Sequence, residues 1–202
     1  MPIEVELKAH VQDNAQNIEA LKRLLFEKAE YLCAFEKDDT YYFPLSPSDI
    51  PRSGIRLRGE SKTLPDGTIK KTAYVTYKTK EVIDGIEVND EKEFEVCSSQ
   101  YSSITVFDEF LKMAGLKPGF SKHKKGWAFS KGGINAELLE VEKLGWFLEM
   151  EIVISNVERE TTIEETKRQL MEFLSDLGIE KDAIESRYYS EMLKELESPS
   201  GS

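Results

Sequence analysis

Short segments that alternate charged with apolar residues recur along most of this 202-residue chain, and they restrict the folds open to it. The first segment is residues 3–11, IEVELKAHV. Successive side chains of a β-strand point to opposite faces of a sheet. Glu4, Glu6 and Lys8 would therefore share one face of this strand, while its isoleucine, valine, leucine and alanine share the other. This period of two predicts a half-buried strand.

At least four further segments place two charged residues on one strand face. The pairs are Arg56 with Arg58, Lys78 with Lys80, Lys122 with Lys124, and Glu149 with Glu151. An exposed sheet face with cross-strand ion pairs would explain any one segment. Together the segments favour another arrangement, because most pairs carry one sign, with carboxylates on the first and last strands and cations between them. If the sheet closes with these faces inward, its interior needs water, metal ions or a charged ligand to compensate the buried charges.

The rest of the chain supplies further strands and several helices. Strands are predicted at residues 30–35, 55–60, 71–80, 91–96, 120–130, 134–142 and 146–155, and helices after a cap at Asn14 or Asn17 and at residues 104–114, 158–177 and 183–196. Residues 38–51, with three prolines and two serines, are predicted to form a loop. We therefore expect an α+β fold, an eight-stranded antiparallel β-barrel with flanking helices. It would form one domain over residues 1–196, followed by a disordered tail at 197–202.

The composition of the chain limits the classes of partner that it can bind. The net charge of −11 argues against nucleic-acid binding, because neutralising phosphates along a strand needs a basic face, but it allows a small anionic ligand. No apolar run approaches the roughly 20 residues that span a bilayer, and the charged start leaves no room for a signal peptide. We expect a cytoplasmic protein without membrane contact. Cys33 and Cys97, the only cysteines, are expected to be buried reduced thiols.

These segments, in this order, resemble the CYTH superfamily, also called triphosphate tunnel metalloenzymes. The family's hallmark is an E-x-E-x-K strand, matched here by Glu4-Val5-Glu6-Leu7-Lys8. That short pattern alone would be weak. Further segments resemble the family in order: EKDDTYYF at 36–43, IRLR at 55–58, TYKTK at 76–80, KEFEV at 92–96, LLEVEKLGWFLEMEI at 138–152 and RYYSEML at 187–193. The resemblance covers nearly the whole chain and implies an eight-stranded tunnel that handles triphosphates with Mg²⁺ or Mn²⁺.

The resemblance also implies residue roles. The metal ligands would be Glu4, Glu6, Glu149 and Glu151, and the phosphate-binding residues would be Lys8, Arg56, Arg58, Lys78, Lys122 and Lys124, with Lys8 and Glu6 as catalytic residues. Two positions depart from the family pattern. Lys124 stands where an arginine is usual, and Leu139 stands where many members carry an aspartate. Glu137, two residues before Leu139 on the same strand face, could replace that aspartate as a metal ligand.

The same resemblance implies a triphosphate as the small-molecule partner, and a homodimer. The EVELK start, the DDTYYF segment and the RYYSEML end are most similar to class IV adenylyl cyclases, which predicts conversion of ATP to cyclic AMP and pyrophosphate. The first alternative is a triphosphatase that hydrolyses inorganic triphosphate, thiamine triphosphate or nucleotides. A second alternative, motivated by Leu139, is a non-catalytic module that binds polyphosphate or nucleotides.

Overall fold

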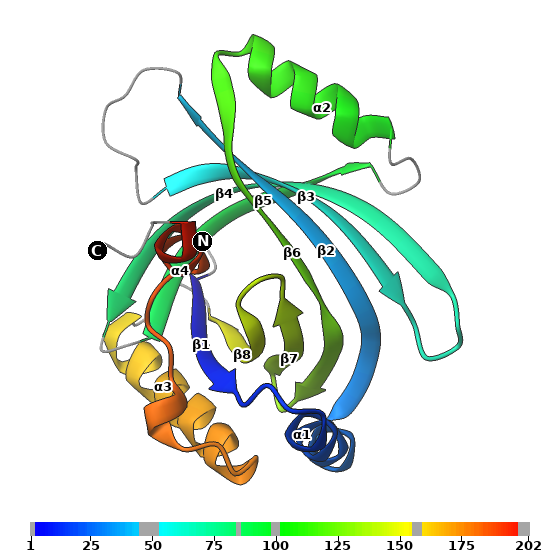
Figure 1. Ribbon diagram of the computed structural model, residues 1–202. Coiled ribbons are helices and arrows are strands. Elements are labelled where there is room, and N and C mark those ends of the chain that lie inside the picture. Colours follow the sequence, from blue (N-terminus) through cyan, green and yellow to red (C-terminus); the bar gives the residue numbers. More distant parts are fainter. Residues whose placement is uncertain (1–2, 45–52, 84–85, 98–101, 155–158, 198–202) are drawn as a thin grey trace, which may run out of the picture.

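A closed antiparallel barrel forms the centre of the computed structural model, which describes residues 3–44, 53–83, 86–97, 102–154 and 159–197 (Figure 1). Its strands follow the order β1-β5-β4-β3-β2-β6-β7-β8, and β8 pairs again with β1. Their bounds are β1 Ile3–Val11, β2 Glu30–Pro44, β3 Ser53–Thr63, β4 Ile69–Ile83, β5 Ile86–Cys97, β6 Leu116–Lys131, β7 Ile134–Val141 and β8 Gly145–Ile154. The predicted eight-stranded barrel is therefore confirmed.

One predicted loop is in part a strand. Residues 38–44 continue β2, whereas residues 45–52 lie outside the described part of the chain. Asp38 and Asp39 are poor strand formers by propensity, but β2 lies between β3 and β6 and pairs with both through this stretch. Pairing on two sides outweighs local propensity, so the loop prediction is wrong for these seven residues.

Four α-helices and one short 3₁₀ helix accompany the barrel in the described residues. They are α1 Ala15–Lys28, α2 Ser102–Met113, α3 Arg159–Asp176, the 3₁₀ turn Lys181–Ala183, and α4 Tyr189–Glu197. Asn14 is the cap of α1, because its side-chain oxygen accepts the backbone N–H of Asn17 at 2.8 Å. The final helix begins six residues later than predicted. No helix in the described ranges is long and apolar enough to cross a bilayer.

The main hydrophobic core lies outside the barrel wall. Outward side chains of β1, including Val5 and Leu7, pack with Leu25 of α1 and with Leu170 and Leu174 of α3. A second cluster joins α2 to the outer faces of β2, β3 and β4, so helices cover the barrel on opposite sides (Figure 1). Apolar burial contributes roughly 25 cal/mol per Å², and it therefore stabilises the orientation in which the apolar strand faces point outward.

The charged strand faces consequently point into the barrel. Lys8 is 2% exposed and Asp39 is 1% exposed, although both are ionisable side chains. Arg56 and Lys124 are buried as well. An exposed sheet face would leave such groups in water, so the structure excludes that alternative.

Candidate active site

The acidic side of the barrel interior is built by β1 and its two neighbours. In register, Glu6 lies opposite Glu87 of β5 and opposite Glu151 of β8, while Lys8 lies opposite Glu149. Like charges directly across a strand pair repel. The Lys8 ammonium offsets part of this repulsion by donating to Glu87 at 3.0 Å, in a pair that is almost fully buried. This side of the interior therefore favours cations.

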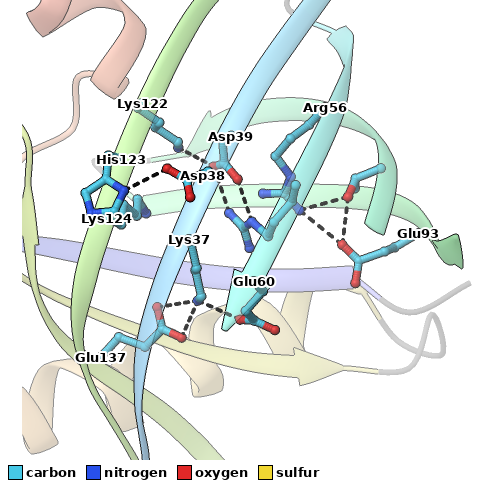
Figure 2. A network of polar contacts seen from close by, with 12 residues as sticks. Lys37, Asp38, Asp39, Arg56, Glu60, Glu93, Lys122, His123, Lys124 and Glu137 are labelled. Carbon is cyan, nitrogen blue, oxygen red and sulfur yellow. Dashed lines mark hydrogen bonds and ion pairs between the residues drawn. The ribbon is translucent and has the colours of Figure 1, made fainter. Parts of the chain in front are cut away.

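A buried carboxylate, Asp39 of β2, organises the basic side (Figure 2). It accepts two hydrogen bonds from Arg58, at 2.6 and 2.9 Å, and Lys122 Nζ lies 3.6 Å away. Burial alone would raise the pKa of Asp39, but Arg58, with a smaller contribution from Lys122, holds it well below the usual range. Asp39 is thus ionised and positions two cations on neighbouring strands.

A second buried ion pair joins the two sides of the interior. Lys124 Nζ donates to both carboxylate oxygens of Glu149, at 2.7 and 2.8 Å. Burial is the largest cause that lowers the pKa of Lys124, and nearby Lys122 and Arg58 add to it. Burial acts to raise the pKa of Glu149, but Lys124 and Lys122 outweigh it and the pKa is lowered. Lys122 and Arg58 lie near this pair and add positive charge, which suits a bound anion.

One donor group of Arg56 has no acceptor among the residues that the structure describes. Its Nη2 group donates to Thr76 at 2.9 Å and to Glu93 at 3.1 Å (Figure 2). Its Nε group is buried and makes no hydrogen bond to any residue that the structure describes. Buried donors are normally satisfied, and a phosphate oxygen is a suitable acceptor for this one.

Leu139, one of the two departures from the family pattern, and Glu137, its predicted replacement, have clear surroundings. Leu139 is fully buried in an apolar cluster with Phe147. Glu137 faces inward as expected, but both its oxygens accept from Lys37, at 2.6 and 2.8 Å, and Glu60 lies 3.8 Å from the same ammonium (Figure 2). Glu137 would have to exchange this lysine for a metal ion, so its role as a ligand stays a prediction.

The structure brings the predicted site residues onto the inward faces of five strands, β1, β3, β6, β7 and β8, with one gap on β4. The side chain of Lys78 lies outside the described part of the structure, and only its backbone, paired with Glu91, can be placed on β4. Sequence reasoning missed several inward residues: Lys37, Asp39, Glu60, Glu87 and Asn89. The signal was present in EKDDTYYF, where Lys37 and Asp39 are two residues apart. Because the prediction rested on pairs of like charge, it did not include this pair of opposite charges.

The carboxylates and the amide described above suit a divalent cation whose coordination shell is completed by substrate. In the described ranges no three side chains already converge as a metal cage. Glu6 and Glu151 nevertheless lie opposite each other, and Asn89 donates to Glu6 at 3.4 Å while its buried Oδ1 atom lacks a hydrogen-bond partner within those ranges. Mg²⁺ commonly binds one or two carboxylates together with substrate phosphates and water. The donor set fits that mode.

Two hollows on the surface lie apart from these residues. They measure about 340 and 400 Å³ and are lined by residues of α3 with its following turn and by residues at α4. No inward-facing strand residue lines either of them. The convergent charges inside the barrel therefore define the candidate site.

Comparison with known proteins identifies the family. The CYTH domain model matches residues 2–189. A Methanocaldococcus jannaschii protein, named as a candidate adenylate cyclase, is 30% identical over 193 residues, which cover 94% of this chain and 98% of that protein. A solved Pyrococcus horikoshii structure has a TM-score of 0.77 at 25% identity, covering 96% of this chain and 99% of that one. A Hippeastrum protein, described as a candidate adenylyl cyclase with a dominant triphosphatase activity, has the same fold, with a TM-score of 0.64 at 16% identity over 96% of this chain and 94% of its own. This chain belongs to the CYTH family.

Proposed function

We propose that this chain is a divalent-metal-dependent enzyme acting on triphosphates inside the barrel, and that its main reaction converts ATP to cyclic AMP and pyrophosphate. The observation that carries the proposal is the enclosed face on which cations and carboxylates of separate strands meet. The relative named as a candidate adenylate cyclase supports the choice of reaction.

The cations would hold the triphosphate. Arg56 and Arg58 offer planar donor pairs to phosphate oxygens, whereas Lys8, Lys122 and Lys124 act as point charges. When no substrate is bound, Asp39 pairs with Arg58 and Lys122, and Glu149 pairs with Lys124. Binding therefore exchanges protein counter-ions for phosphate oxygens.

The carboxylates would hold Mg²⁺ or Mn²⁺. Glu4, Glu6 and Glu151 are the proposed ligands, with the Asn89 carbonyl oxygen as a further ligand. Glu149 and Glu137 would join them by releasing Lys124 and Lys37. Such a cation supplies charge neutralisation at the phosphates. In the cyclase reaction the ribose 3′-hydroxyl loses its proton to solvent and its oxygen bonds to the α-phosphorus, while the bond from that phosphorus to the α–β bridging oxygen breaks and pyrophosphate leaves. Phosphoryl and nucleotidyl transfer of this kind depend mainly on positioning and electrostatic stabilisation, which these fixed charges provide.

Two other functions use the same groups. In a triphosphatase, water replaces the ribose oxygen as nucleophile, and the dominant triphosphatase activity of the Hippeastrum neighbour favours this as the second candidate. A non-catalytic module would bind the triphosphate and leave it intact. The apolar surroundings of Leu139 keep that third possibility open, because they leave one carboxylate fewer on β7.

A product analysis separates the three functions. ATP, inorganic tripolyphosphate and thiamine triphosphate are each incubated with Mg²⁺ or Mn²⁺. Cyclic AMP with pyrophosphate supports the cyclase, orthophosphate supports the triphosphatase, and binding without turnover supports the module. For an enzyme, Glu4→Gln and Arg56→Ala should each lower the rate about 100-fold, whereas Lys125→Ala on the outer face of β6 should not. Unchanged rates in both inner variants would place the chemistry elsewhere.

A further inference from the structure

A tyrosine of the C-terminal helix, Tyr189, lies among the cations of the candidate active site. Its ring centre is 4.7 Å from Lys8 Nζ, 5.1 Å from Lys122 Nζ and 4.6 Å from Lys124 Nζ. The side chain is 6% exposed. Three ammonium groups from two strands thus surround one ring, and all three belong to the proposed phosphate-binding set.

The chain fixes this ring in place from two sides. The edge of the ring meets Phe147 of β8 at a centroid distance of 5.1 Å. Just before α4, the backbone N–H of Glu185 donates to the carbonyl of Lys8 at 2.8 Å, and Ile184 forms an antiparallel bridge with Ala9. The start of α4 is therefore fastened to β1 beside Lys8, so the position of Tyr189 follows from the fold.

The hydroxyl of Tyr189 is buried and has no well-formed hydrogen bond in the described part of the chain. Glu149 lies close enough to act as a weak acceptor for the phenol, although the contact falls outside good hydrogen-bond geometry. Burial, and then the charge of Glu149, hold the pKa of Tyr189 well above its usual value, so the phenol stays protonated. A buried, unsatisfied donor beside three ammonium groups is suited to an anionic acceptor.

We propose that Tyr189 is a substrate-binding residue whose phenol donates a hydrogen bond to a phosphate oxygen held by Lys8, Lys122 and Lys124. The inference rests on the proposed function, because it takes the anion to be the triphosphate of that site. It adds a contribution from α4 to a site otherwise built by strands. The substrate site is then complete only when the C-terminal helix is docked.

Replacing the hydroxyl alone tests this role in the full-length protein. Binding of inorganic tripolyphosphate to wild type and Tyr189→Phe is measured by isothermal titration calorimetry without divalent metal, so that no turnover intervenes. We expect the Kd of the variant to rise about tenfold, which corresponds to the loss of one hydrogen bond to a charged group. The thermal midpoint without ligand should stay equal or rise, because the variant removes an unsatisfied buried hydroxyl. Tyr77→Phe is the control, since Tyr77 is 44% exposed on the outer face of β4.

Each outcome of these binding measurements either supports or overturns the inference. Wild-type binding with an unchanged Kd for Tyr189→Phe would overturn the inference and leave the proposed function intact. If the ring only occupies space, Tyr189→Ala should bind more tightly than wild type while Tyr189→Phe binds equally, and this too would overturn it. A wild-type protein that binds no tripolyphosphate either without metal or with Mg²⁺ would overturn the proposed function together with the inference.

Discussion

Replacing Asp39 by asparagine should destabilise the empty barrel. The Asp39 side chain is fully enclosed and accepts two bonds from Arg58, with Lys122 at 3.6 Å. Removing one partner of a buried ion pair costs about 3–5 kcal/mol, because the other charge stays buried. Asparagine keeps one oxygen acceptor for Arg58, so we expect a loss near the lower end, about 3 kcal/mol.

The same change should tighten triphosphate binding. Asp39 competes with the ligand for Arg58 and Lys122 and repels its phosphates. A unit charge about 6 Å from a phosphate, at an effective dielectric constant near 20, contributes roughly 3 kcal/mol at most. Even half of this repulsion corresponds to about a tenfold lower Kd. A tenfold gain in affinity at saturating ligand would restore about 1.4 kcal/mol of the lost stability.

Urea unfolding at pH 7, with and without inorganic tripolyphosphate, measures both effects in one experiment. Asp38→Asn is a matched control, because Asp38 is the adjacent residue, points out of the barrel and pairs with His123 at the surface. That variant should change stability by less than about 0.5 kcal/mol. Asp39→Asn with wild-type stability, or with weaker tripolyphosphate binding, would refute the view that Asp39 is an internal counter-ion.

Two pH-dependent predictions follow from the lowered pKa values. Triphosphate affinity should fall as the pH rises through the lowered pKa of Lys124, because only the ammonium form of this lysine binds phosphate. Calorimetry across the pH range should show that Lys124→Arg moves this decline to higher pH, whereas Lys125→Arg on the outer face does not. Hydrogen bonds from Arg187, partly opposed by burial, lower the pKa of Glu185 to about 2. The stability that Glu185 contributes to the fold is therefore present above an unfolded-state pKa of about 4.3 and is lost as the pH falls towards 2. Glu185→Gln should cost roughly 1–2 kcal/mol of stability at pH 7, discounted for water screening. In chemical unfolding the variant should show a flatter acid dependence of stability, and an unchanged slope would refute this prediction.

Periodicity was enough to predict the strands that alternate cleanly and the side on which their charges lie. Glu4, Glu6 and Lys8 share a face for a local reason, and the structure confirms that this face is internal. What the period could not supply was the partner of each charge. The pairing of Lys124 with Glu149, or of Lys8 with Glu87, depends on strand order, and strand order is set by contacts far apart in the chain.

Tyr189 and Asp39 show two further limits of the sequence pattern. Tyr189 lies in the RYYSEML segment at the start of a helix, and the segment alone does not indicate that its second tyrosine contacts lysines of β1 and β6. Asp39 lies in a stretch whose propensities favour a loop and becomes strand only through its two neighbours. The predicted homodimer and cytoplasmic location concern surroundings of the molecule, and they stay predictions that light scattering and cell fractionation would test.

The pairing of β1 with β8 has a consequence for how the protein acquires its activity during synthesis. Glu6 and Glu151 are neighbours in space, yet about 145 residues of chain separate them, so a ribosome must release most of the polypeptide before the two can meet. Closure of the circle is a long-range event of the kind that folds slowly. Shortened products that end before β8 would retain the E-x-E-x-K strand and still lack every contact that β8 makes with it. Catalytic competence should therefore arise late in synthesis, only after β8 has paired with β1.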